Sequence, residues 1–196
     1  MTGAVLTCCA GTNADIFPRI LGMYVKHGAL VADTTYGKGV FWRAVDESLY
    51  RLSKSDLADG TDALKLPHTD SSFDALVFDP PYLNGGKGAK ESINKCYKNP
   101  GHNSYEAVLR LYLAAALEAY RVLRRDGVWI VKCQPGVADH VQRPVHVHLI
   151  STLPLIGMRF EDEFVLHASA TPVMRHVTQK HARKNHSYFL VFRKVR

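Results

Sequence analysis

The segment FDALVFD, at positions 73–79, is an apolar run that ends abruptly at Pro80 and Pro81. A short apolar run bounded by chain-breaking residues is typical of a buried strand. Two successive prolines remove two main-chain donors, so the chain must leave the sheet at this point. Asp79 is therefore expected at the carboxyl end of a strand, where open α/β sheets bind their ligands.

The same order of strand, loop and helix recurs along the chain. We expect strands over residues 28–34, 49–52, 73–79, 128–133, 159–167 and 187–192. We expect helices over residues 40–45, from 103 or 104 to 125, and over 137–149. This alternation predicts a doubly wound α/β fold with a mainly parallel sheet. The last two strands lie close together in the sequence and predict an antiparallel pair at one edge of that sheet.

The chain has 196 residues, of which 46% are hydrophobic, with no repeat and no Pro/Ser-rich linker. It is long enough for one full core, so we expect a single domain over residues 1–196. The sequence has no run of roughly 20 apolar residues that could span a membrane. Its first residues also lack the basic segment followed by an apolar segment that is typical of a signal peptide, so we expect a cytoplasmic protein. The four cysteines form no CxxC pair, and His146 and His148 lack a third ligand nearby, so we expect no metal site.

A possible chemistry for Asp79-Pro80-Pro81-Tyr82 follows from its residue types. An exocyclic amino group of a nucleic-acid base is a poor nucleophile, because its lone pair is delocalised into the ring. Asp79 and the carbonyl of Pro80 could each accept one of its hydrogens, which favours attack on an electrophilic methyl group. Tyr82 would stack on the base, which must leave a duplex to be reached. The alternative is a proline-rich turn in which Asp79 is a local cap.

A glycine-rich loop follows the first expected strand, in the sequence VADTTYGKG at positions 31–39. Glycines also mark ordinary turns, so Gly37 and Gly39 alone are a weak signal. Asp33 strengthens it, because a carboxylate at the strand end suits the cationic amino-acid part of a cofactor. The loop is not GxGxxG, which disfavours a dinucleotide.

Together, VADTTYGKGVFW and DPPY resemble the S-adenosylmethionine-dependent amino-methyltransferases, which modify adenine N6 or cytosine N4 in DNA. The resemblance covers nearly the whole chain and implies a Rossmann-like class I methyltransferase fold with S-adenosylmethionine as cofactor. It implies that the catalytic residues are Asp79, Pro80, Pro81 and Tyr82. It assigns cofactor binding to Asp33, Thr34, Gly37, Gly39, Asp56, Asp62, Thr12 and Asn13.

Within that set, the resemblance gives Asp56 to the cofactor ribose and Asp62 to its adenine ring. It also implies that residues 11–15, which include Thr12 and Asn13, close over the methionine end.

Several further residues are candidates for binding a substrate. The resemblance places Lys132 and Gln134, at the end of the strand 128–133, in the pocket for the target base. Residues 83–103, with Lys87, form a long loop after the catalytic tetrapeptide, for which a mobile lid and an unstructured insertion are the two interpretations. The chain carries a formal charge of +7, with basic residues gathered near its C-terminus. Among them, Arg183, Lys184 and His186 favour a phosphate contact, the alternative being a charged edge strand protected from aggregation.

We therefore expect an enzyme of a bacterial or phage-infected cell that methylates adenine N6 in DNA. Cytosine N4 in DNA and an RNA base, such as guanine N2, remain alternatives. A non-catalytic nucleic-acid-binding module with the same fold is the alternative from another class. The chain has no insertion large enough for a separate target-recognition domain, so a homodimer or a specificity partner could complete the enzyme.

Overall fold

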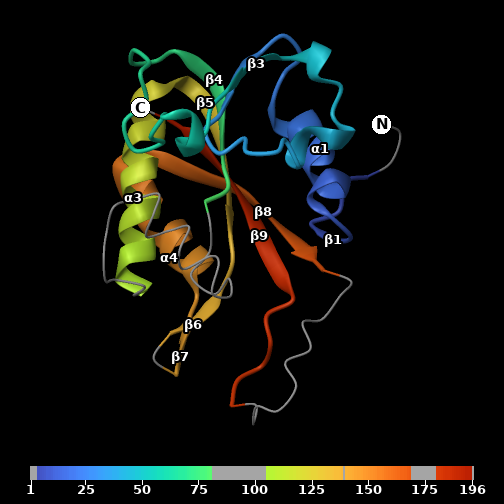
Figure 1. Cartoon of the computed structure of the whole chain (residues 1–196), viewed down its shortest axis with the longest axis vertical. Coiled ribbons are helices and arrows are strands. Elements are labelled where there is room, and N and C mark those ends of the chain that lie inside the picture. Colours follow the sequence, from blue (N-terminus) through green and yellow to red (C-terminus); the bar gives the residue numbers. More distant parts are fainter. Residues whose placement is uncertain (1–3, 81–104, 139, 169–179, 196) are drawn as a thin grey trace.

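A computed structural model describes residues 4–80, 105–138, 140–168 and 180–195 (Figure 1). Pro81, Tyr82, Lys87 and the expected lid over residues 83–103 lie outside the described residues. No helix in the described part of the chain has both the length and the apolar character needed to cross a membrane.

A seven-stranded sheet forms the centre of the molecule, in the order β1-β8-β9-β5-β4-β2-β3. Its strands are β1 (Cys8–Ala10), β2 (Leu30–Asp33), β3 (Arg51–Lys54), β4 (Phe73–Phe78), β5 (Leu123–Cys133), β8 (Met158–His167) and β9 (His186–Lys194). Strands β3, β2, β4 and β5 pair in parallel, whereas β9 is antiparallel to both β5 and β8. The predicted α/β fold with a mainly parallel sheet is confirmed.

The expected antiparallel pair is β8 and β9, but it does not form the edge of the sheet. The short strand β1 pairs in parallel with β8 and covers it. Residues 189–192 of β9 are completely buried, because side chains on both faces of this inner strand pack into the core. A continuous apolar run is typical of a strand covered on both faces.

Helices cover both faces of the sheet and divide the core into two layers. On one face lie α1 (Asn13–Tyr24) and the 3-10 helix η1 (Phe41–Ala44), and on the other lie α3 (Tyr105–Val122), α4 (Val145–Thr152) and the 3-10 helix η4 (Leu153–Ile156) (Figure 1). Successive side chains of a strand point to opposite faces, so Trp129 packs under α3 while Ile130 packs with α1. Two further 3-10 helices are η2 (Glu47–Leu49) and η3 (Leu57–Asp59).

Some expected boundaries were wrong. The second strand covers residues 51–54 rather than 49–52, and α3 ends at Val122 instead of residue 125. The helix expected over 137–149 begins only at Val145, after a hairpin of β6 (Gly136–Ala138) and β7 (Val141–Arg143). Pro144 precedes the first helical residue, where proline favours a helix start but cannot continue one from upstream.

Candidate active site

Asp33 is the last residue of β2 and Asp79 directly follows β4, so both lie at the carboxyl ends of two neighbouring parallel strands. Strand β2 pairs with β4 so that Asp33 lies opposite Val77, two residues before Asp79. A hollow of about 150 Å³ opens at these strand ends. Its walls consist of Asp33, Thr35, Tyr36, Gly37, Lys38, Val40, Phe41 and Asp79. The structure thus brings the two main sequence motifs together at one cavity.

The carboxylate of Asp33 is buried and held from two sides. Its Oδ2 accepts a hydrogen bond of 2.7 Å from the Trp42 indole, and its Oδ1 accepts one of 3.0 Å from the amide of Thr35. Burial raises the pKa of Asp33 to about 6, although both hydrogen bonds act in the opposite direction. A charged Asp33 therefore lacks part of the stabilisation that water would give it, and a cation at the hollow would restore it.

Thr35 connects the glycine loop to Asp79, a contact that the sequence interpretation missed. Its hydroxyl accepts a 2.7 Å hydrogen bond from the main-chain amide of Asp79. The neighbouring Thr34 points elsewhere, because its amide and its hydroxyl both donate to the carbonyl of Val77. Thr34 does not line the hollow, and its assignment to the cofactor stays a prediction.

The glycine loop is held in shape by its own backbone and by Asp56. The amide of Gly39 donates to the carbonyl of Tyr36 at 2.8 Å, and Gly39 has a φ of +63°. The Asp56 carboxylate accepts 3.1 Å and 2.9 Å hydrogen bonds from the amides of Gly37 and Ala58. Asp56 is therefore beside the loop, and the contact to the cofactor ribose that the resemblance implies stays a prediction.

The other expected cofactor residues do not line this hollow. Asp62 accepts a 2.8 Å hydrogen bond from the amide of Leu64, which closes a local turn. Thr12 caps α1, and its amide and hydroxyl both donate to Asp15 at 2.7 Å. The Oδ1 of Asn13 is buried and has no hydrogen-bond partner among the described residues. It is an acceptor that a ligand amine would satisfy.

Lys132 is the charged neighbour of Asp79. It lies near the end of β5, next to β4, and its ammonium is 3.7 Å from Oδ2 of Asp79. Lys132 is only 7% exposed, and its ammonium lies over the rings of Phe41 and Phe189. Burial lowers the pKa of Lys132, and the Asp79 carboxylate partly offsets this effect. The ammonium thus faces Asp79 from inside the protein, and a direct contact with substrate stays a prediction.

Gln134, one of the expected substrate residues, links the end of β5 to the start of β9 by a hydrogen bond. The Gln134 side-chain amide donates to the carbonyl of His186 at 3.1 Å. Lys184 and His186 lie close enough that the charge of Lys184 contributes, after burial, to lowering the pKa of His186. Gln134 and His186 are therefore neighbours in space, although 52 residues apart in sequence.

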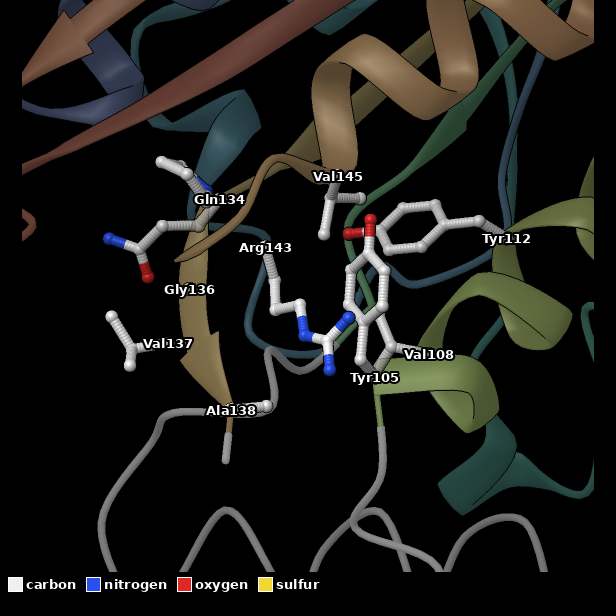
Figure 2. Close-up of a pocket in the computed structure, with 10 residues that line it drawn as sticks. Tyr105, Val108, Tyr112, Gln134, Gly136, Val137, Ala138, Arg143 and Val145 are labelled. Carbon is white, nitrogen blue, oxygen red and sulfur yellow. The ribbon is translucent and has the colours of Figure 1, made fainter. Parts of the chain in front are cut away.

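A second hollow lies beside Gln134, on the face of the sheet covered by α3 and α4 (Figure 2). It is lined by Tyr105, Val108, Tyr112, Gln134, Pro135, Gly136, Val137, Ala138, Arg143 and Val145. The Tyr112 hydroxyl donates to the carbonyl of Lys132 at 2.9 Å, so this hollow adjoins the strand end that carries the Asp79 counter-ion. Tyr105 and Arg143 gave no sequence signal, because only folding brings the start of α3 against the β6–β7 hairpin.

Comparisons with known proteins identify the fold. No protein-family model and no curated protein sequence matches the chain. A 1,6-didemethyltoxoflavin-N1-methyltransferase of Burkholderia thailandensis, solved with S-adenosylhomocysteine, matches 94% of this chain and 79% of its own, with 14% identity and a TM-score of 0.59. The fold is that of the Rossmann-like methyltransferases. A protein of Bacillus halodurans C-125, assigned as a methyltransferase, matches 93% of this chain and 100% of its own, with 12% identity and a TM-score of 0.58.

A third match extends over less of both chains. A Thermus thermophilus protein assigned as a DNA modification methylase, solved with S-adenosyl-L-methionine, has 20% identity and a TM-score of 0.49. The match covers 69% of this chain and only 54% of the Thermus protein. At such identities, the two matches with TM-scores of 0.59 and 0.58 establish the methyltransferase fold and leave the substrate open.

Proposed function

We propose that this protein transfers a methyl group from S-adenosylmethionine to the exocyclic amino group of a nucleic-acid base, adenine N6 in DNA. The observation that carries the proposal is the position of Asp79. Its carboxylate lines the hollow formed by the glycine loop, and its backbone and side chain are held by Thr35 and Lys132. A hydrogen-bond acceptor fixed at this place is what activation of an amino group requires.

The residues at the hollow fit the cofactor. Asp33 offers a buried carboxylate whose raised pKa favours a nearby cation, which the amino group of S-adenosylmethionine would supply. Because Gly37 and Gly39 carry no side chains, a cofactor can approach the backbone of the loop. The Asp56 carboxylate accepts a hydrogen bond from the amide of Gly37 and so holds the loop in place. When bound, the cofactor supplies an electrophilic methyl group on a sulfonium.

Each of the protein groups proposed to contact or support the target base has a separate role. The carboxylate of Asp79 accepts a hydrogen bond from one N–H of the amino group and the carbonyl of Pro80 accepts one from the other, which directs the nitrogen lone pair outward. The proton that the nitrogen loses on methylation leaves along the hydrogen bond to Asp79 and passes to solvent. Lys132 stabilises the charge of Asp79, because an ammonium at 3.7 Å in a poorly hydrated place favours the carboxylate form. Tyr82 is proposed to stack on the base, as the resemblance implies.

The substrate is proposed from charge as well as from the motif. The formal charge of +7 and the basic residues Arg183, Lys184 and His186 suit a polyanion. DNA with adenine as the target is preferred because DPPY resembles the adenine-modifying group. Cytosine N4 and RNA bases are outcomes of the test described next.

The test is transfer of radiolabelled methyl groups to unmodified DNA and to total RNA in parallel, followed by nucleoside analysis. Label in N6-methyladenine from DNA would support the proposal, and label only in N4-methylcytosine or in RNA would replace the substrate. Asp79→Ala should abolish transfer while cofactor affinity, measured by calorimetry, stays within about threefold. Unchanged turnover in Asp79→Ala would overturn the role of this carboxylate. If the protein binds the cofactor but transfers no methyl group to any polynucleotide, the fold assignment stands and the proposed activity is overturned.

A further inference from the structure

Among the described residues that line the second hollow, Arg143 at the end of β7 carries the single charged side chain. The other lining residues are apolar, aromatic, or the neutral Gln134, with no carboxylate among them. Its free space is about 20 Å³, room for one group of the size of a water molecule or a single oxygen atom. A small cavity of this composition selects a ligand group by charge and hydrogen bonding more than by shape.

Two hydrogen-bond donors on the residues that line this hollow are of special interest. The Nε of Arg143 and the hydroxyl of Tyr105 are both buried without a hydrogen-bond partner in the described part of the chain. Figure 2 shows the Arg143 guanidinium beside the Tyr105 ring, and its central carbon lies 4.9 Å from the ring centroid. Tyr105 is only 4% exposed, and burial raises its pKa, so its hydroxyl stays protonated and able to donate.

Donors buried without partners are unusual, because desolvation without a new hydrogen bond is unfavourable. The adjacent Tyr112 shows the normal situation, since its buried hydroxyl donates to the carbonyl of Lys132 at 2.9 Å. A ligand that satisfies the Nε of Arg143 and the hydroxyl of Tyr105 must bring a hydrogen-bond acceptor. A negatively charged oxygen meets this requirement best, because it also pairs with the guanidinium charge.

We propose that Arg143 and Tyr105 bind a non-bridging oxygen of a phosphodiester in the substrate strand. The proposal rests on the proposed function, because the phosphodiester belongs to the polynucleotide whose base is methylated. The position is suitable: Tyr112 lines the hollow, and its hydroxyl donates to the main-chain carbonyl of Lys132 near the carboxyl end of β5. The proposed phosphate contact therefore lies at the carboxyl end of β5, the strand that pairs with β4, which Asp79 follows. It fixes the position of the strand without selecting its sequence.

The test uses the full chain and a fluorescent single-stranded oligonucleotide, with anisotropy measured over a range of salt concentrations. Arg143→Gln should weaken binding about tenfold and lower the slope of log affinity against log salt by about 0.7 to 1. Tyr105→Phe, which removes only the hydroxyl, should weaken binding about threefold with the slope unchanged. The affinity of both variants for S-adenosylmethionine, measured by calorimetry, should equal that of the wild type.

Arg125→Gln is the matched control, because it removes the same charge from an exposed place near the amino end of the parallel strands. Equal effects of Arg143→Gln and Arg125→Gln would overturn the proposal, since only general charge would then matter. An oligonucleotide with neutral methylphosphonate linkages should reduce the difference between wild type and Arg143→Gln. A difference that persists there, with altered base preference, would identify a base carbonyl as the ligand and overturn the phosphodiester.

Failure of the proposed function has a different signature. In that case the wild-type protein itself would bind cofactor but no polynucleotide, and both the proposed function and the phosphodiester contact would be overturned. If the wild type binds DNA and the variants Arg143→Gln and Tyr105→Phe bind it equally well, only the phosphodiester contact would be overturned. If Arg143→Gln fails to fold, Arg143→Lys keeps the charge and loses the guanidinium geometry, so its affinity should be intermediate with the salt slope retained.

Discussion

The hydroxyl of Thr35 accepts a 2.7 Å hydrogen bond from the main-chain amide of Asp79, while the amide of Thr35 donates to the carboxylate of Asp33 at 3.0 Å. One residue thus holds both the proposed cofactor carboxylate and the proposed catalytic loop. The relationship crosses two strands and 44 residues of sequence. It means that the position of Asp79 depends on the conformation of the glycine loop.

Thr35→Val should separate these two functions. The valine keeps the shape and the main-chain contact to Asp33 but leaves the Asp79 amide without its acceptor. We expect a loss of stability of about 1 kcal/mol and a fall in kcat of about tenfold, with cofactor affinity changed little. Thr35→Ser, which retains the hydroxyl, is the control and should restore most of the activity. Equal kcat values for the valine and serine variants would contradict the positioning role.

Asp33 should make stability depend on pH in an unusual direction. Its folded-state pKa of about 6 lies above the ordinary value of 3.8. Between these values the folded protein binds the extra proton, so the contribution of Asp33 to stability falls as the pH rises from about 4 to about 6. The total effect is of the order of 3 kcal/mol. Urea unfolding of wild type and Asp33→Asn from pH 4 to 7 should give curves that diverge, with the variant gaining relative stability as pH rises. Parallel curves would contradict the raised pKa.

A side chain at Gly39 should strain the backbone and displace the Tyr36 side chain. An added Cβ would lie 2.7 Å from the Tyr36 hydroxyl, at a residue whose φ is +63°. Gly60 is the matched control, because its φ is +84° and no described atom lies within 4 Å of an added Cβ. We expect Gly60→Ala to cost about 1 kcal/mol through backbone strain alone. Gly39→Ala should cost more and also weaken cofactor binding, as measured by thermal unfolding and calorimetry. Similar cofactor affinities in the two variants would argue against a cofactor site at this loop.

The pair of Asp79 and Lys132 should show an asymmetric double-mutant cycle. The Lys132 side chain is 9% exposed and that of Asp79 is 26% exposed. Asp79→Asn leaves the more buried charge without its carboxylate and should cost about 3 kcal/mol, whereas Lys132→Met should cost about 1 to 2 kcal/mol. The double variant should cost less than the sum, because it removes both charges. Denaturant unfolding measures all three, and additive values would show that the two groups do not interact.

The fold was largely predictable because its elements have strong local patterns. The apolar run over residues 73–79 and the two prolines after it predicted β4 and its end, and the apolar late segment predicted β9. The hairpin over residues 136–143 was missed, because its strands are three residues each and carry no clear alternation. The edge strand β1 was missed for the same reason, since so short a strand is defined by its partner β8 and not by its own sequence.

By itself, the sequence determined that Asp33, the glycine loop and Asp79 lie at or just after the ends of apolar strands, because strand ends and turns depend on local residue types. Only the tertiary structure decided that Thr35 and not Thr34 holds Asp79, that Lys132 is its enclosed counter-ion, and that Arg143 meets Tyr105. Thr34 and Thr35 are chemically identical neighbours. Their hydroxyls have different partners because the chain places them differently against β4, and the register that fixes this placement depends on packing across the whole sheet.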